Sequence, residues 1–422
     1  YFTDGTGRTL NHQIVSDNIN RGWGGQYYYT VLVEMDIQSL GYSTCILKSD
    51  SEKGLIYSYE PHDRIIEFPS YILENDKIKV CFNPTTAAIT SFVDKSTDTE
   101  YLDSTKPSGI FRYIEENTLK KMTSWIVGRY MNIQDITENV RITGYKRGEN
   151  LLRQSLTYTA KFKDSELNVT VYLDKDSSNL VYDVSCEWKQ FGEHDKYIPQ
   201  LNFHMPFAYK CDEYKYEVPF GTCIRKPADD DRPSTGFVLA MNKDTRNKSM
   251  MLYSDSKYGY RTQENSLSLT LIRGSYDPDP YPEIGMHKFQ IAVGLTDNPD
   301  NMSLIEQASC IMHPLISMSV KPQKGTLATK GNFMKVLEKG TCVISSVKMS
   351  DIDTKIAVIR LYETENKKSK TTISFGRKIK SAKHVLLDEI TYYTDSGLLI
   401  EKDCITITVN PYCISTVLIE FE

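Results

Sequence analysis

The alternation of apolar and polar residues along the chain follows a period of two. Three stretches show it clearly, at residues 167–173, 267–271 and 405–409. Because successive side chains of a strand point to opposite faces, each stretch is predicted to be a β-strand with one buried face and one polar face. Clusters of turn-forming residues, at 174–179 and 242–247, follow such strands. The pattern therefore favours sheets joined by turns.

Helical periodicity is nearly absent. The best helix candidate is short, at about residues 303–310, and Pro314 follows it. Strands that follow one another without helices between them pair antiparallel, which favours β-sandwiches over a Rossmann fold or a (β/α) barrel. The predicted fold class is therefore all-β, with a large antiparallel super-sandwich followed by a smaller β-sandwich.

Three stretches divide the chain. Their predicted bounds are 1–48, 49–316 and 317–422. The first begins irregularly and ends in a predicted strand pair around residues 27–33 and 42–47. The second carries a strand series too long for an immunoglobulin-like unit, and suits a large sandwich. The polar stretch around 321–325 is typical of a linker, after which six or seven short strands are expected.

Composition and charge limit the classes of partner that the chain is expected to bind. The 422 residues hold 50 Lys and Arg against 55 Asp and Glu, a net charge of −5. A mildly acidic chain without a basic patch argues against a nucleic-acid or anionic-membrane partner. No run of about 18 apolar residues is present, so no membrane span is expected. The start at Tyr1, without Met or a basic and apolar leader, predicts no signal peptide and suggests a piece of a longer polypeptide.

The cysteines and histidines give no metal or disulfide pattern. The nine cysteines are odd in number, widely spaced and without a Cys-x-x-Cys motif. Reduced thiols in a cytoplasmic protein are the favoured interpretation. The seven histidines are scattered, without His-x-His, His-x-x-x-His or His-x-Asp spacing, so no metal site made by this chain alone is expected.

The most unusual stretch is 273–287, which follows the predicted strand ending at Ile272. Prolines at 278, 280 and 282 fix the backbone dihedral φ and extend the residues before them, so the loop is predicted to be stiff. It carries Asp277, Asp279 and Glu283 next to Arg273, a combination that commonly reads sugar hydroxyls. The alternative is that the prolines only block edge pairing and Arg273 neutralises an acid.

Two neighbouring motifs are further candidates for sugar contact. His287 shares the inward face of the next predicted strand with Phe289, so it is either a buried histidine with a carboxylate partner or a ligand-facing one. Tyr258 and Tyr260 flank Gly259, and their rings and hydroxyls suit a sugar. The alternative is that both tyrosines are edges of the core. The three tryptophans are interpreted as packing residues, namely Trp23, Trp125 and Trp188.

Four motifs occur in an order and spacing that resemble a known family. They are Tyr-Glu-Val-Pro-Phe-Gly-Thr at 216–222, Asp-Ser-Lys-Tyr-Gly-Tyr at 255–260, Leu-Ser-Leu-Thr-Leu-Ile-Arg at 267–273, and Pro-Asp-Pro followed by Gly-Met-His at 278–287. Together they resemble the C-terminal half of glycoside hydrolase family 38, the retaining α-mannosidases. Flanking stretches agree, at 37–42, 73–80, 89–95, 358–363 and 410–416. The resemblance runs from about residue 26 to 422.

The resemblance implies that the catalytic domain lies N-terminal to everything in this chain. It implies that this domain brings the zinc site and the nucleophilic Asp, so that the chain itself carries no catalytic residue and no cofactor. It also implies that Arg273 reaches the sugar or the catalytic carboxylates, while Asp279 and His287 shape the loop beside it. The expected partners are the chain's own catalytic domain and a mannoside or oligosaccharide, with a homo-oligomer left open.

The sequence also leaves three other functions open. The chain could be a freestanding carbohydrate-binding module, or a scaffold that only buttresses a catalytic barrel. It could also be an enzyme of its own, such as an aldose epimerase or a polysaccharide lyase, since large galactose-mutarotase-like sandwiches host both. That third possibility needs its own acid and base, for which His287 with Glu283, or His204, are the candidates.

Overall fold

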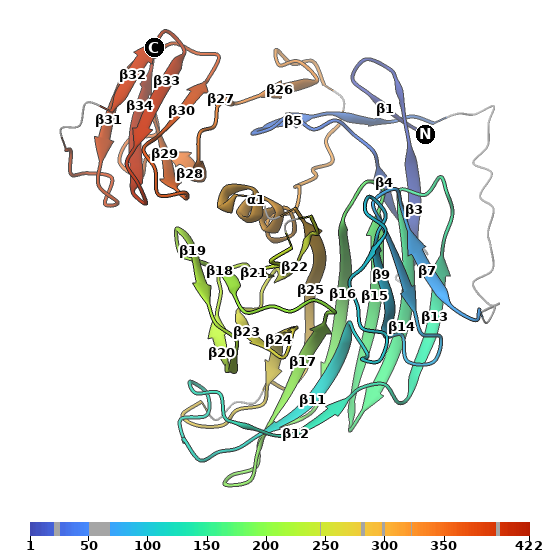
Figure 1. Cartoon of the computed structure of the whole chain (residues 1–422). Helices are drawn as coiled ribbons and strands as arrows, with labels where there is room; N and C mark the ends of the chain where they lie inside the picture. Colours follow the sequence, from blue (N-terminus) through green and yellow to red (C-terminus); the bar gives the residue numbers. More distant parts are fainter. Residues whose placement is uncertain are drawn as a thin grey trace.

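We describe the protein from a computed structural model. It describes residues 1–20, 26–49, 68–244, 246–279, 283–297, 300–321, 323–393 and 397–422, without the side chains of 17–20 and 26–28. In this part of the chain the elements are strands, apart from a single α-helix, and the strand pairs are antiparallel. The all-β prediction is confirmed, with a large sandwich and a smaller one placed side by side (Figure 1).

The first strands form small sheets of their own. They are β1 (Phe2–Asp4), β2 (Thr9–Leu10), β3 (His12–Asn20), β4 (Gln26–Val33), β5 (Gly41–Ser43) and β6 (Cys45–Leu47). The predicted pairing of 27–33 with 42–47 is wrong. β4 pairs with β3, whereas β5 pairs with the distant β26 (Lys330–Asn332) and β6 pairs with β1. An alternating pattern reveals a strand but not its partner, and β4 pairs with the strand next to it in sequence.

The large sandwich begins with a four-stranded sheet in the order β10-β9-β8-β7. Its strands are β7 (Tyr71–Glu74), β8 (Ile78–Phe82), β9 (Ile89–Asp94) and β10 (Thr99–Glu100). A six-stranded sheet in the order β12-β11-β17-β24-β23-β20 follows. Its strands are β11 (Ile110–Glu116), β12 (Tyr130–Asp135), β17 (Ile198–Pro206), β20 (Ala228–Pro233), β23 (Gly259–Gln263) and β24 (Ser266–Arg273).

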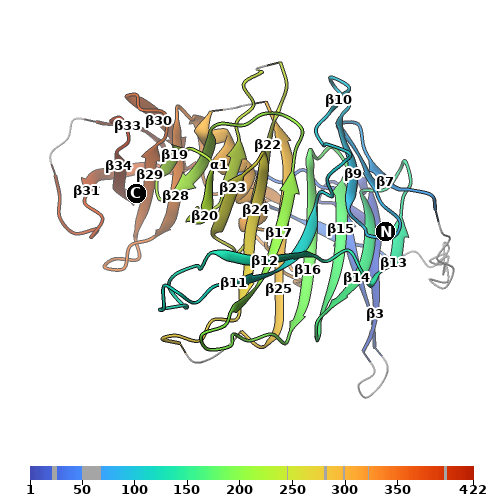
Figure 2. The same cartoon turned by 60° about the horizontal axis from the view of Figure 1, so that its bottom comes forward.

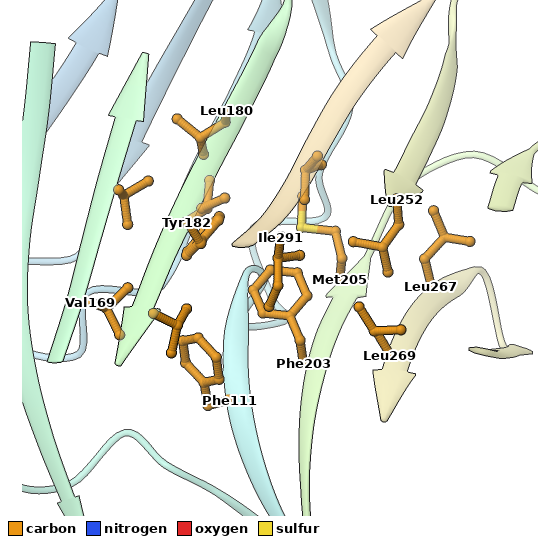
Figure 3. Close-up of a cluster of buried hydrophobic side chains, with 14 of the residues drawn as sticks. Phe111, Val169, Leu180, Tyr182, Phe203, Met205, Leu252, Leu267, Leu269 and Ile291 are labelled. Atoms are coloured by element: carbon orange, nitrogen blue, oxygen red, sulfur yellow. The ribbon is translucent and has the colours of Figure 1, made fainter. Parts of the chain in front are cut away.

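A nine-stranded sheet forms the other layer, in the order β13-β14-β15-β16-β25-β22-β21-β18-β19. Its strands are β13 (Val140–Lys146), β14 (Arg153–Phe162), β15 (Ser165–Asp174), β16 (Asn179–Trp188), β18 (Tyr214–Val218), β19 (Gly221–Arg225), β21 (Phe237–Ala240), β22 (Ser249–Ser254) and β25 (Gly285–Thr296). Apolar residues at alternate positions of both sheets interlock as one core, where Phe111 and Phe203 of one sheet meet Tyr182 of the other (Figure 3).

The helix and the smaller sandwich complete the chain. Helix α1 (Asn301–Met312) starts and ends two residues outside the predicted 303–310, with Asp300 as its N-cap. The smaller sandwich packs the sheet β27-β30-β33-β32 against β28-β29-β34-β31. Its strands are β27 (Lys335–Glu338), β28 (Cys342–Met349), β29 (Ile356–Glu363), β30 (Ser369–Ser374), β31 (Ile379–Val385), β32 (Leu398–Glu401), β33 (Cys404–Val409) and β34 (Ile414–Phe421).

Other predictions can be checked against these elements. Residues 314–321 and 323–329 form neither helix nor strand, as expected of a linker, whereas the bounds 1–48, 49–316 and 317–422 stay predictions. All nine cysteines are free thiols. None of the described helices is long and apolar enough to cross a membrane. Trp188 is fully buried as predicted, Trp125 is 72% exposed, which the packing prediction did not allow, and Trp23 lies outside the described residues.

Candidate functional site

Three loops meet at one end of the large sandwich. They follow β11, β16 and β24, at residues 117–129, 189–197 and 274–284, the last described except for 280–282. The Gly192 amide donates to the Gly274 carbonyl at 2.8 Å, and the Ser124 amide donates to the Asp277 carbonyl at 2.7 Å. The loops after β11 and β24 lie together at the lower left of Figure 1, and again in Figure 2. The proline-rich stretch at 273–287 is therefore part of a cluster of loops that hydrogen bonds hold together.

Thr123 and its neighbours tie the loop after β11 to the proline-rich loop. The buried Thr123 Oγ1 accepts hydrogen bonds from the amides of Tyr276, at 3.2 Å, and Asp277, at 3.1 Å. The Met122 amide donates to Asp277 Oδ2 at 3.0 Å, and the Asp279 amide donates to Ser124 Oγ at 3.3 Å. These bonds hold the two loops in one arrangement.

Arg273 forms a two-pronged ion pair with Glu116. Arg273 Nε donates to Glu116 Oε1 at 2.9 Å, and Nη2 donates to Oε2 at 2.7 Å and to the Ile126 carbonyl at 3.2 Å. Glu116 has no exposed surface, and its carboxylate also accepts from Gln200 Nε2 and the Gly128 amide, both at 2.8 Å. Such a fork fixes the plane of the guanidinium. The alternative in which Arg273 neutralises an acid therefore describes part of its role, but the acid is a residue that the sequence did not single out.

The ion pair continues into a polar network on the outer face of the six-stranded sheet. The Tyr130 hydroxyl lies 2.8 Å from Gln200 Oε1 and 3.1 Å from Asp231 Oδ1. Arg261 Nε donates to the same Asp231 oxygen at 2.9 Å, and the Arg261 guanidinium lies 3.4 Å from the centre of the Tyr130 ring. Burial, and then the Asp231 carboxylate, raise the pKa of Tyr130, so its hydroxyl stays protonated. This network, through Gln200 and Glu116, therefore helps to fix the position of the Arg273 side chain.

One edge of the guanidinium is left for other contacts. Among the described residues, no hydrogen-bond partner is present for Arg273 Nη1, and the side chain keeps 15% of its surface exposed. A guanidinium that is fixed on two sides and open on the third can donate to a hydroxyl or a carboxylate without first losing rotamer entropy.

The loop acids Asp277 and Asp279 lie on the same short segment of the proline-rich loop. Asp277 already accepts an amide at Oδ2, and Asp279 is exposed on the same short loop. Retaining glycoside hydrolysis uses two carboxyl groups about 5–5.5 Å apart on either side of the bond. Asp277 and Asp279 lie only two residues apart on one loop, so the two are better suited to binding than to flanking a scissile bond from opposite sides.

His287 binds a carbonyl rather than a carboxylate. Its Nε2 lies 2.7 Å from the Glu283 backbone oxygen, and the side chain is half-buried on the same face of β25 as the buried Phe289. His204 is held through Nδ1, 2.8 Å from Ser268 Oγ. Burial, assisted by Arg112 and Lys106, lowers the pKa of His204 to about 3, so it is neutral at physiological pH. Among the described residues, neither His287 nor His204 pairs with a carboxylate.

The two tyrosines around Gly259 lie in different environments. Tyr258 is 54% exposed. Because Gly259 pairs with Thr270, Tyr258 lies near the end of β24 that carries Arg273. Tyr260 has no exposed surface, and its hydroxyl donates to the Gly236 carbonyl at 2.7 Å. Tyr260 is thus the core residue of the pair, with no surface to offer a sugar, whereas Tyr258 precedes β23 (Gly259–Gln263).

The smaller sandwich carries a hollow of its own, outside the loop cluster. This hollow has a volume of about 330 Å³, and its residues are far along the chain from those of the polar network. It is lined by Val385, Leu386, Leu387, Tyr393, Ile414 and Thr416. No carboxylate or imidazole lines it, so it lacks an acid or base. In the described part of the chain, no three His, Cys, Asp or Glu residues gather to hold a metal ion.

The comparisons with known proteins agree with the fold and with the resemblance. Residues 73–281 match the family described as "Glycosyl hydrolases family 38 C-terminal domain". Residues 341–417 match "Glycosyl hydrolases family 38 C-terminal beta sandwich domain". The chain belongs to glycosyl hydrolase family 38, of which it contains these C-terminal domains.

Individual relatives are longer than this chain. "Alpha-mannosidase" of Saccharomyces cerevisiae is 24% identical over 239 residues, which cover 53% of this chain and 22% of the relative. A family 38 protein and an α-mannosidase, both from Enterococcus faecalis, superpose with TM-scores of 0.74 and 0.69 at 15% identity. Both cover 100% of this chain, which spans 52% and 50% of their own lengths. At this identity the likeness shows the fold.

Proposed function

We propose that this chain is the non-metal-binding portion of a retaining α-mannosidase, which hydrolyses terminal α-mannosides. In this role it supports the catalytic domain and lines one wall of the substrate cleft. Family membership and the name of the yeast relative support the reaction class. The two carboxyl groups and the zinc ion that the family resemblance implies belong to the catalytic domain, so the chain alone is expected to be inactive.

The observation that carries the proposal is the state of Arg273. Its guanidinium is aligned by the buried Glu116, keeps Nη1 available, and lies where three loops meet. A fixed cationic fork can hold a sugar hydroxyl, or a carboxylate of the catalytic domain, in one orientation. Asp279, Tyr258 and His287 contribute to substrate binding beside it, the first two through exposed side chains and His287 by shaping the loop that ends at Gly285. Tyr260 supports this edge through packing.

The compartment and partners follow from the same proposal. Nine free thiols support a reducing compartment, for which we propose the cytoplasm. The partners are the chain's own catalytic domain and a mannoside or oligosaccharide. On the outer face of the six-stranded sheet, Arg261 and Arg273 are paired with Asp231 and Glu116, so their charges are balanced and less suited to a nucleic-acid backbone.

The test is the activity of the full-length gene product that contains this chain, measured with 4-nitrophenyl α-D-mannopyranoside. We expect hydrolysis with retention of configuration, and we expect Arg273→Lys, which keeps the charge but loses the fork, to lower kcat/KM by about 100-fold. Turnover of R273K within about twofold of the wild type would rule out the assignment of Arg273.

Glu116→Gln is the matched control, because it weakens the same ion pair while leaving the guanidinium in place. If Arg273 acts only as a structural partner of Glu116, the two variants lose activity and Tm in parallel. If Arg273 contacts the substrate or the catalytic carboxylates, R273K loses far more activity than E116Q at a comparable Tm. Absence of α-mannosidase activity in the folded wild-type product would refute the function itself.

A further inference from the structure

Trp125 is an exposed residue of the loop cluster. Its side chain keeps 72% of its surface accessible, although it is the largest apolar side chain on the loop after β11. Trp188, in contrast, is fully buried in the core of the large sandwich. Exposing an indole forgoes the burial that normally stabilises a tryptophan, about 25 cal/mol for each Å² of apolar surface. An exposed aromatic ring on an ordered loop is a feature that binding sites share.

The backbone on both sides of Trp125 is fixed. The preceding residue, Ser124, donates its amide to the Asp277 carbonyl at 2.7 Å and accepts the Asp279 amide at Oγ. The following residue, Ile126, accepts Arg273 Nη2 at its carbonyl, at 3.2 Å. The Trp125 amide itself donates to the Met122 carbonyl at 2.9 Å. The ring is therefore presented from a preorganised backbone, which lowers the entropy cost of placing a ligand against it.

The chemistry around the ring selects the ligand. The Asp279 amide binds Ser124 and the Arg273 guanidinium binds the Ile126 carbonyl, so polar groups lie against both residues that flank the apolar ring of Trp125. A pyranose ring has the complementary form, with an apolar face of C–H groups and a rim of hydroxyls. A nucleobase is a poorer match, since the adjoining loop carries Asp277, Asp279 and Glu283 and a phosphate backbone would be repelled.

We propose that Trp125 is the stacking platform for a pyranose ring at this edge of the large sandwich. The proposal deepens the proposed function and rests on it for the identity of the sugar, because the platform lies beside the arginine assigned to the substrate cleft. Trp125 thereby becomes a specificity-determining residue for the glycan that enters the cleft, acting through its ring face rather than through a charged group.

The experiment measures sugar binding by calorimetry, using an α-linked mannobiose as the probe and the full-length gene product as the protein. We expect Trp125→Ala to weaken binding by about tenfold and Trp125→Phe to retain most of it, because phenylalanine still offers a ring face. The control is Leu119→Ala on the same loop, whose side chain is 85% exposed, and which should bind as the wild type does. Equal affinity of W125A and the wild type would overturn the proposal.

A second readout separates a sugar platform from a surface covered by polypeptide. Acrylamide quenching of the wild type, compared with W125F, isolates the emission of Trp125. We expect the quencher to reach Trp125 in the sugar-free full-length protein, and mannobiose to protect it. If Trp125 is already shielded without sugar, another part of the polypeptide covers it and the platform does not exist.

The two experiments also distinguish a failure of the Trp125 platform from a failure of the proposed α-mannosidase function. Trp125-dependent binding of a sugar by a product without α-mannosidase activity refutes the proposed reaction and leaves the platform in place. Arg273-dependent hydrolysis with unaltered mannobiose binding in W125A retains the reaction and refutes the platform.

Discussion

Glu217 is a carboxylic acid placed where it is poorly solvated. It lies on β18, and no hydrogen-bond partner for its Oε2 is present among the described residues. The same oxygen lies 2.0 Å from where a β-carbon on Gly236 would stand, which leaves no room for a side chain there. Burial raises the pKa of Glu217 to about 7, against a smaller lowering by the Phe237 backbone N–H.

This raised pKa predicts a pH dependence of stability. The folded state holds its proton up to about pH 7, whereas the unfolded state releases it near pH 4.5, so stability falls as pH rises through that window. The loss is on the order of 3 kcal/mol. In Glu217→Gln this part of the slope disappears, which a comparison of Tm at pH 5 and pH 8 measures. Exposed Glu149→Gln should behave as the wild type, and an unchanged slope in E217Q would contradict the prediction.

Single residues show where sequence reasoning was sufficient and where it stopped. The loop after Arg273 was found from its prolines and acids, because those are local signals. Glu116 was not, since 157 residues separate it from Arg273 and no local pattern marks a buried partner. Exposure of Trp125 was likewise invisible, because tryptophan is buried far more often than it is presented.

At the scale of elements, Thr123 is the joint between two loops. Its Oγ1 is the acceptor for two backbone amides of the proline-rich loop, those of Tyr276 and Asp277. Thr123→Val keeps the shape but removes the acceptor, leaving both amides unpaired at a cost of about 1–3 kcal/mol. The effect should be local, since the strands on either side keep their ladders.

Hydrogen exchange tests this joint residue by residue. In T123V the amides of Tyr276 and Asp277 should exchange at least about tenfold faster, while those of β24 keep wild-type rates. Thr118→Val on the same loop is the control, because among the described residues the Thr118 hydroxyl has no hydrogen-bond partner, and only its carbonyl accepts, from the Lys121 amide. Unchanged protection of both amides in T123V would show that the loop is held by other contacts.

Elements also show the limits of pattern reading. The alternation at 167–173, 267–271 and 405–409 identified β15, β24 and β33, because apolar side chains that face the core alternate with polar ones on the other face, which in β24 is itself largely buried. The same pattern could not predict which strands pair with each other. β5 pairs with β26 across almost the whole chain, and a period of two is the same whichever strand lies alongside.

At the scale of the whole molecule, α1 joins the two sandwiches. Apolar residues of α1, of β21 and β22, and Tyr362 of β29 form one buried cluster between the large sandwich and the small one. Asn301 reinforces it, since its side chain accepts from Lys215 Nζ of the large sandwich and donates to the Thr364 carbonyl of the small one, both at 2.7 Å. The sandwiches therefore share a core rather than only a linker, which couples their unfolding.

Tyr362 is the residue whose removal should uncouple them. It is 7% exposed and meets Phe220, at the β18–β19 turn, edge-on with ring centres 5.5 Å apart. Tyr362→Ala deletes a large ring from the shared cluster, at a cost of about 3–5 kcal/mol. Because β29 also pairs within the small sandwich, that domain should weaken most and unfold first. Calorimetry of Y362A is expected to resolve two transitions where the wild type shows one. Tyr392→Ala, which removes a ring that is 60% exposed on the same domain, should leave a single transition, and superimposable Y362A and wild-type scans would mean that the linker alone joins the sandwiches.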